Sequence, residues 1–212
     1  MEPDIEQPPP LLASFAKRLN DGEVIAFPTE TYYGLLARID RPQALRRIFI
    51  LKGRSAQVAL PVIVADAGTA FSLWRDPPPA ARLLTDRFWP GPLTLVSPAA
   101  TDKVDPLITG DTGQVGVRLP GSAAARGIAA MAGGALVATS ANPSRQPPAT
   151  SAAEVAAYFG DQVAVADGPQ LPPSRGSTVL SLAEWPPRLL RDGDLDYRHI
   201  ETLLEVALTL GN

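Results

Sequence analysis

The stretch that most constrains the fold covers residues 22–36 and reads GEVIAFPTETYYGLL. Residues 24–27 are apolar, and Pro28 is expected to end this short strand because proline lacks the N–H that a sheet ladder needs. Five hydrogen-bonding side chains follow at 29–33. Open α/β sheets bind ligands at the carboxyl ends of strands, so the pattern favours a site here. A polar turn with two half-buried tyrosines explains the stretch equally well.

Further short apolar segments predict the rest of the sheet. Residues 59–65, ALPVIVA, are apolar throughout, as expected of a strand covered on both faces. Helical segments intervene without strict alternation, so the predicted class is α/β, a twisted mixed sheet flanked by helices. The expected strands are 24–27, 59–65, 93–96, 115–119, 135–139, 163–166, 178–182 and 188–191. The expected helices are 11–19, 42–52, 67–74, 78–88, 122–132, 151–159 and a terminal helix over 195–212, whereas 99–113 is expected to be loop.

A length of 212 residues predicts one domain, 1–212, with residues 1–10 as a loose arm, although two small lobes sharing a cleft would also fit. The chain has no cysteine, which excludes disulfides, thiolate catalysis and cysteine-bound metal. Its start lacks the pattern of a signal peptide, and no apolar run reaches the roughly 18 residues of a membrane span. We therefore expect a cytoplasmic protein with no membrane partner.

Charge and motif content exclude several classes of site. The 19 basic and 22 acidic residues nearly balance, which argues against a broad footprint for nucleic acid but leaves a local basic cleft open. His199 is the single histidine and lies near the end of the chain. The residues needed for Ser-His-Asp catalysis or for a metal site with several histidines are therefore missing. Neither G-x-x-x-x-G-K-[ST] nor G-x-G-x-x-G occurs. The chemistry must come from other polar side chains or from a metal that a substrate brings, and no protein metal site is predicted.

Lys52 and Arg54 leave the end of the predicted helix 42–52 with only Gly53 between them. Cations at this position interact well with the helix dipole, so a solvated basic helix end is one explanation. The other is a clamp for a polyphosphate or a carboxylate, because Gly53 lets the backbone come close to a ligand.

Residues 139–144, TSANPS, follow an apolar strand with four hydrogen-bonding side chains in six positions. Small hydroxyl and amide groups can hold phosphate oxygens or a nucleotide sugar. A capping turn before the next helix is the competing explanation.

Arg118 and Arg191 each lie in an apolar segment, VGVRLP and RLLRDG. A buried arginine needs a partner, which is either a carboxylate of the protein or an anionic ligand. For Arg191, Asp192 and Asp194 are ordinary candidates.

Seven motifs occur along residues 22–193: PTETYYGL, the K-G-R pair, FWPGPLTLV, VGVRLP, ATSANPS, GSTVLSL and RLLRDG. In this order they resemble the threonylcarbamoyl-AMP synthases, the YrdC-like family, in the short form without an additional C-terminal domain. The resemblance implies a twisted α/β fold around a large, positively charged cleft.

The resemblance also implies a reaction. L-threonine, bicarbonate and ATP, with Mg²⁺ carried by the ATP, give L-threonylcarbamoyladenylate and pyrophosphate. A downstream tRNA threonylcarbamoyl transferase complex then modifies adenosine 37 of tRNA. Weak RNA binding is compatible with the resemblance as well.

Individual residues receive roles from the same resemblance. Lys52 and Arg54 match the K-x-R element and are expected to be catalytic by stabilising the phosphates. Arg118 is expected to pair with the threonine carboxylate. The expected threonine-binding residues are Thr31, Arg118 and Thr139, and the expected nucleotide-binding residues are Lys52, Arg54, Ser140, Asn142, Ser177, Thr178 and Arg191.

Two departures from the family pattern stand out. Many members follow the K-x-R pair with Asn-Pro-Leu and a histidine, whereas residues 55–61 read SAQVALP, which leaves open how threonine is held on that side. Many members also have glycine where this chain has Arg145, a change expected to affect a loop over the nucleotide.

Three alternatives stay open. One is a catalytically weak paralogue that binds RNA or nucleotide, against which the intact K-x-R and S-x-N elements argue. The second is a carbamoyl-adenylate enzyme of the hydrogenase-maturation kind, which the absence of acylphosphatase and zinc-finger segments disfavours. The third is a double-stranded RNA-binding module, which the acidic net charge disfavours.

Overall fold

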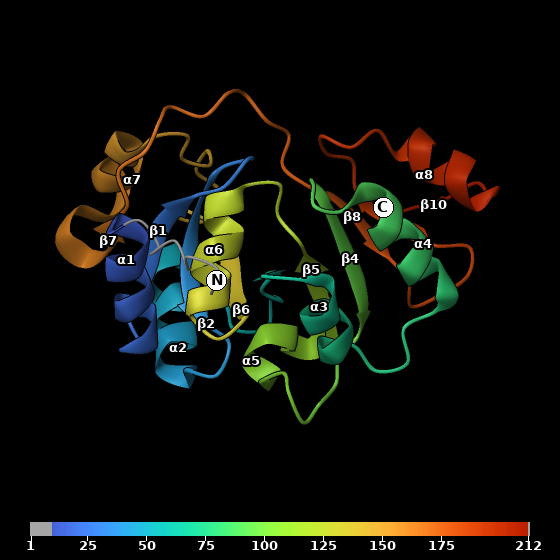
Figure 1. The fold of residues 1–212 in the computed structure, drawn as a ribbon, viewed down its shortest axis with the longest axis horizontal. Coiled ribbons are helices and arrows are strands. Elements are labelled where there is room, and N and C mark those ends of the chain that lie inside the picture. Colours follow the sequence, from blue (N-terminus) through green and yellow to red (C-terminus); the bar gives the residue numbers. More distant parts are fainter. Residues whose placement is uncertain (1–9, 212) are drawn as a thin grey trace, which may run out of the picture.

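The computed structural model describes residues 10–211, and one ten-stranded sheet runs through them (Figure 1). The strand order is β10-β9-β8-β4-β5-β3-β6-β2-β1-β7. Parallel pairs such as β3–β5 adjoin antiparallel pairs such as β4–β5, which confirms the mixed α/β class. The strands are β1 (Ile25–Pro28), β2 (Tyr33–Arg38), β3 (Val62–Val64), β4 (Leu93–Pro98), β5 (Gln114–Arg118), β6 (Ala135–Ser140), β7 (Ala164–Val165), β8 (Thr178–Ser181), β9 (Arg188–Arg191) and β10 (Thr209–Leu210).

Helices connect these strands, and most begin and end within two residues of the sequence prediction. Several helices begin with a side-chain cap: Ser151, for example, accepts a hydrogen bond from the Glu154 N–H at the start of α7. The described helices are α1 (Pro10–Asn20), α2 (Pro42–Lys52), α3 (Ala67–Leu73), α4 (Pro79–Phe88), α5 (Pro106–Thr109), α6 (Ala123–Met131), α7 (Ala152–Phe159) and α8 (Tyr197–Leu204), with 3-10 turns at Gly110–Thr112 and Gly160–Gln162. The predicted arm at 1–10 lies outside the described residues except for Pro10, which begins α1.

Strand β1 ends at Pro28, as the sequence predicted, and Pro28 is itself the last residue of the strand. Pro28 pairs with Tyr33, and residues 33–38 form a second strand, β2, that the sequence interpretation missed. The β1–β2 connection is a tight turn in which the Thr29 N–H and hydroxyl both donate to the Tyr32 carbonyl, at 3.1 and 2.8 Å. The five polar residues therefore form a hairpin turn and the start of a strand.

Two other expectations are corrected. The terminal helix predicted over 195–212 ends at Leu204, because Glu205 adopts a left-handed conformation, and β10 follows. The segment 99–113, predicted as loop, contains α5, whose first turn is capped by the Asp105 carboxylate accepting from the Leu107 N–H at 2.8 Å.

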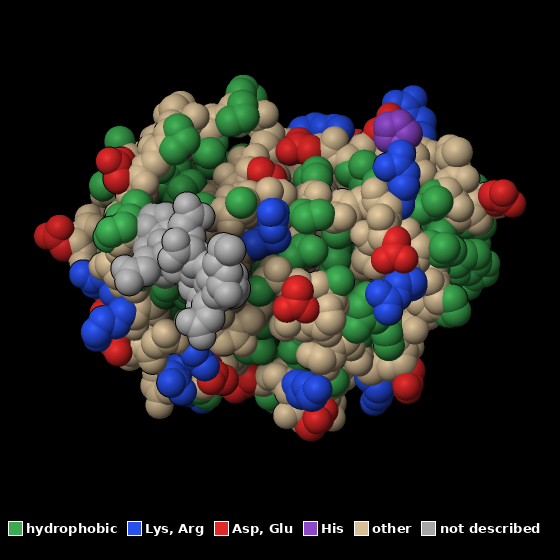
Figure 2. All heavy atoms as spheres, in the orientation of Figure 1, with side chains coloured by type: hydrophobic (Ala, Val, Ile, Leu, Met, Phe, Trp, Pro, Cys, Tyr) green, Lys and Arg blue, Asp and Glu red, His purple; other side chains and the backbone are tan. Residues whose placement is uncertain are grey.

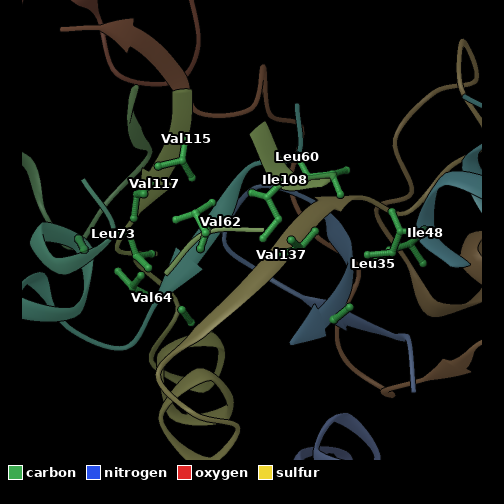
Figure 3. Close-up of a cluster of buried hydrophobic side chains, with 14 of the residues drawn as sticks. Leu35, Ile48, Leu60, Val62, Val64, Leu73, Ile108, Val115, Val117 and Val137 are labelled. Atoms are coloured by element: carbon green, nitrogen blue, oxygen red, sulfur yellow. The ribbon is translucent and has the colours of Figure 1, made fainter. Parts of the chain in front are cut away.

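One face of the sheet packs against most of the helices. Strand residues such as Val62, Val117 and Val137 meet Ile48 of α2 and Leu73 of α3 in the larger hydrophobic cluster. Figure 3 shows part of this cluster, with side chains from β2, β3, β5 and β6 directed into one apolar volume. Burying such a side chain completely stabilises the fold by about 1.5–3 kcal/mol. The apolar contacts on this face therefore stabilise the sheet, and a ligand site is expected on the opposite face.

The opposite face is covered only in part. Helices α1 and α6 pack over it through Leu19 and Ile128, against Ile25, Leu36 and Leu136. The strand residues described in this second cluster, or packed against it, come from β1, β2, β3, β6 and β7 but not from β4, β5 or β8. Helices α1 and α6 therefore cover this face at one end of the sheet and leave it uncovered over β4, β5 and β8.

Acidic and basic side chains are intermingled on the coloured part of the face shown in Figure 2, without one large patch of either sign. Within residues 10–211, no helix is both long and apolar enough to cross a membrane.

Candidate functional site

A pocket of about 580 Å³, here called the central pocket, opens over the strands that α1 and α6 leave uncovered. Its floor includes Thr94 and Val96 of β4 together with Gly116 and Arg118 of β5. These are alternate residues, which point to one face because side chains along a strand alternate. The pocket continues past the ends of β2 and β6 to the last residues of α2. Its size lies within the roughly 300–1,000 Å³ of small-molecule sites.

Nine of the ten residues predicted from the sequence line this pocket. They come from the β1–β2 turn, the end of α2, β5, the end of β6, the approach to β8, and β9. The nine are Thr31, Lys52, Arg54, Arg118, Thr139, Ser140, Asn142, Ser177 and Arg191. A second cavity, of about 680 Å³ beside α2, α7 and β7, contains none of them. The structure thus brings together segments that are far apart in the chain.

Lys52 is buried and holds the turn that follows β6. Its ammonium donates to the Ser140 carbonyl at 2.6 Å, to the Asn142 carbonyl at 2.9 Å and to Asn142 Oδ1 at 3.3 Å. Burial and the positive charge of Arg54 lower its pKa to about 8. In this structure Lys52 therefore positions the Ser-Ala-Asn turn at the pocket wall.

Arg54 follows Gly53, which ends α2 as a left-handed C-cap, and its side chain lines the pocket. Its Nη2 donates to the Ala59 carbonyl at 3.0 Å, and its guanidinium lies 5.9 Å from the centre of the Phe49 ring. Its Nε is buried and has no hydrogen-bond partner among the described residues. Buried donors are nearly always satisfied, so this nitrogen is suited to an acceptor on a ligand.

Arg118 is balanced by a carboxylate of the protein. Its Nη1 donates to Glu30 Oε1 at 2.7 Å and contacts Thr31 Oγ1 at 3.5 Å. Burial lowers the pKa of Arg118 and Glu30 opposes that shift. The sequence offered a protein carboxylate or a ligand as partner, and the structure has the carboxylate.

Arg191 and Ser177 form a connected polar group on the far wall. Arg191 donates through Nε and Nη2 to the Ser177 carbonyl at 2.9 and 2.7 Å, and through Nη2 to Ser177 Oγ at 2.9 Å. Ser177 Oγ lies 2.8 Å from Thr94 Oγ1. These bonds orient both residues at the pocket wall.

Thr178 is the one predicted site residue that does not line the pocket. Its side chain is fully buried, its hydroxyl donates to the Leu195 carbonyl at 2.6 Å, and it accepts from the Gly193 N–H at 3.0 Å. Ser177 and Thr178 are adjacent, so they face opposite ways. Thr178 therefore holds the turn after β9, and its expected contact with nucleotide has no support in the geometry.

The sequence interpretation missed several lining residues. Thr94, Thr112, Gln114 and Gly116 come from β4, β5 and the turn before β5. Alternation within LTLV and QVGVR was the available signal, but it does not tell which strands are neighbours.

The charge of the lining is one-sided. Among its described residues the pocket wall includes Lys52, Arg54, Arg118, Arg145 and Arg191, and neither Asp nor Glu. Such a wall favours an anionic ligand, and its threonine and serine hydroxyls can accept or donate hydrogen bonds to it.

Comparison with known proteins agrees with the seven motifs. The model of the Sua5/YciO/YrdC family, described as "Telomere recombination", matches residues 17–193. A threonylcarbamoyl-AMP synthase of Pyrococcus abyssi is 40% identical over 187 residues, covering 88% of this chain and 55% of that protein. One of Bacillus subtilis is 37% identical over 196 residues, covering 92% and 57%.

A solved structure extends the similarity to three dimensions. The crystal structure of P. abyssi Sua5 complexed with L-threonine has a TM-score of 0.90 to this fold, at 37% identity. The match covers 94% of this chain and 58% of that one, so the chain spans little more than half the length of these relatives. From its motifs, its fold and these matches, the chain belongs to the Sua5/YciO/YrdC family.

Proposed function

We propose that this chain makes L-threonylcarbamoyladenylate and pyrophosphate from L-threonine, bicarbonate and ATP. The observation that carries the proposal is the convergence of nine motif residues in one pocket whose described lining holds five cations and no carboxylate. That lining also supports the positively charged cleft expected from the family. The names of the relatives, threonylcarbamoyl-AMP synthase, agree with this activity.

The reaction needs positioned cations more than an acid–base pair. The threonine amine loses a proton to solvent and attacks the carbon of bicarbonate, whose C–OH bond breaks with loss of water, or the carbon of CO2 formed by that same loss; either route gives a carbamate. A carbamate oxygen then attacks the α-phosphorus of ATP, and pyrophosphate leaves with the bonding electrons. Both steps concentrate negative charge, so fixed cations in a sheltered pocket would lower their barriers. Mg²⁺ enters the proposal with ATP, as part of the substrate.

In the proposed arrangement Arg54 contacts the phosphates. Its buried Nε, which has no hydrogen-bond partner within residues 10–211, supports this role, because a phosphate oxygen would satisfy it. Lys52 shapes the turn that carries Ser140 and Asn142, and in this arrangement its charge would lie beside the same nucleotide. Ser177 and Arg191 would approach the nucleotide from the opposite wall.

Threonine would bind around Thr31, Arg118 and Thr139, all of which line the pocket. The bound threonine of P. abyssi Sua5 makes this amino acid the first candidate. Arg118 contacts Glu30 and Thr31 through Nη1, which leaves its other donors for the threonine carboxylate. A partner transferase would then move the threonylcarbamoyl group to tRNA, and any RNA binding by this chain would be weak.

The test is incubation with ATP, Mg²⁺, ¹⁴C-bicarbonate and one amino acid at a time, followed by chromatography of the adenylates. Label in an adenylate with threonine alone supports the proposal. Label in an adenylate with serine alone would show that serine, and not threonine, is the amino-acid substrate. No labelled adenylate with any amino acid, from a chain that still binds ATP, would instead support a paralogue that has kept the nucleotide site without the synthesis.

A further inference from the structure

Arg145 has a strained backbone at the wall of the central pocket. Its φ is +72°, in the left-handed region that side chains other than glycine rarely adopt. Within residues 10–211 two other residues besides glycine have positive φ, Asp76 and Glu205, and neither lines the central pocket. Strain that coincides with a binding pocket calls for a functional explanation.

The loop around Arg145 is fixed on both sides. The Ser144 N–H donates to the Lys52 carbonyl at 2.8 Å, and Asn142 Nδ2 donates to the Gln146 carbonyl at 2.5 Å. The residues before and after Arg145 are thus tied to the turn that Lys52 organises. The left-handed conformation is therefore imposed by this frame, whichever side chain occupies the position.

Nothing in the described protein accounts for an arginine there. Its side chain is exposed, and no hydrogen bond or ion pair joins its guanidinium to residues 10–211. Glycine would relieve the strain without disturbing any described contact of the side chain. The retained guanidinium is best explained by a ligand that occupies the pocket.

We propose that Arg145 binds the β- and γ-phosphates of the nucleotide, and so the pyrophosphate that is released. This inference rests on the proposed function. Arg118 is buried on the floor beside Thr31 and suits a compact carboxylate. An exposed guanidinium at the wall suits the end of the ligand that carries several charges and leaves toward solvent, and its planar fork matches phosphate oxygens.

Direct titration with ATP, ADP and AMP, each with Mg²⁺, tests the assignment on four forms of the chain: unchanged, Arg145→Gly, Arg145→Ala and Arg145→Lys. Both Gly and Ala should weaken ATP binding by about tenfold, as expected for one lost charge-assisted contact, and Lys should recover part of it. AMP binding should change less than about twofold. The melting temperature should rise for Arg145→Gly and not for Arg145→Ala, which separates strain from charge.

Two variants outside the pocket serve as controls. Glu205→Gly relieves a comparable strain, at φ +53°, and should raise the melting temperature with ATP affinity unchanged. Arg46→Ala removes an exposed cation that lines neither cavity and should change ATP affinity less than about twofold at physiological salt.

The remaining outcomes contradict either this inference alone or this inference together with the proposed function. If the unchanged chain binds no ATP, this inference and the proposed function both fail. If it binds ATP and the Gly and Ala forms bind equally well, only the role of Arg145 is lost. Equal weakening of AMP and ATP would rule out the β- and γ-phosphates as the contact.

Discussion

Glu30 and Arg118 form an ion pair beside the central pocket, with Oε1 of Glu30 2.7 Å from Nη1 of Arg118. Oε2 of Glu30 accepts a hydrogen bond from the Ser122 N–H at 3.2 Å, just before α6. One carboxylate therefore joins the β1–β2 turn, β5 and the start of α6. It fixes the guanidinium that the proposal assigns to the threonine carboxylate.

Glu30→Gln should lower the free energy of unfolding by about 1–3 kcal/mol, because it leaves the buried charge of Arg118 without a counter-ion. Chemical denaturation measures this. The matched control is Glu23→Gln, whose partner Arg18 and own side chain are both 46% exposed, and which should cost less than about 1 kcal/mol. Threonine should stabilise Glu30→Gln more than the unchanged chain, since its carboxylate replaces the lost charge. Equal stabilisation of both would remove Arg118 from the threonine site.

The lowered pKa of Lys52 predicts that the stability of the fold depends on pH. Its pKa is about 8 in the fold and about 10.4 in the unfolded chain, so between these values the unfolded state binds more protons. Stability therefore rises with pH relative to a Lys52→Met variant, by roughly 2 kcal/mol between pH 7.5 and 9.5. Urea denaturation of both forms at pH 7.5, 8.5 and 9.5 measures the difference. A constant difference across this range would mean that Lys52 keeps an ordinary pKa.

Substitutions at Ser177 and Thr178 should have different effects: one should mainly weaken ATP binding and the other should mainly lower the free energy of unfolding. Thr178→Val removes two buried hydrogen bonds and should lower the free energy of unfolding by about 2–3 kcal/mol, with ATP affinity within about twofold of normal. Ser177→Ala removes the contact with Arg191 Nη2 and should weaken ATP binding several-fold, at a stability cost of about 1 kcal/mol. Thermal melts and ATP titrations on both variants give the comparison. The reverse pattern would show that Thr178 faces the ligand.

Gly110 supports the wall that holds Arg54. A Cβ at this position, where φ is +53°, would lie 2.2 Å from the Gln57 carbonyl oxygen. Gly110→Ala should lower the free energy of unfolding by about 3 kcal/mol, and should weaken ATP binding because it displaces the segment 57–59, in which the Ala59 carbonyl accepts the hydrogen bond of Arg54. Gly113→Ala is the control, with φ +64° and no atom within 4 Å, and should cost only about 1–2 kcal/mol. Similar costs for the two would argue against the close contact.

Much of the site could be predicted from sequence because its residues lie in short runs next to apolar strands. TSANPS after β6 and the Lys-Gly-Arg end of α2 are local patterns, and local patterns can be read in order. It is harder to infer which face of the sheet a given strand residue points to. Thr178 and Ser177 have the same chemistry, and only the packing of β8 decides which of them faces the pocket.

Other features depend on contacts between distant segments. Glu30 and Arg118 are 88 positions apart, so no spacing identifies them as partners. The floor residues Thr94 and Gly116 meet because β4 and β5 pair, which the sequence does not state. Strand β2 was missed because five of its six residues are buried and it shows no alternation. The apolar stripe of α8 continues to Leu208, whereas the helix ends at Leu204 without a glycine or proline to mark the end.

The most direct test of the whole account is the rate of pyrophosphate release by the unchanged chain and by Arg54→Ala, with each substrate omitted in turn. Release should require ATP, threonine and bicarbonate together, with one pyrophosphate for each threonylcarbamoyladenylate, and kcat/KM should fall by at least about a hundredfold in Arg54→Ala. Pyrophosphate release without threonine or bicarbonate, or an unchanged rate in Arg54→Ala, would contradict the claim that these residues form one synthase site.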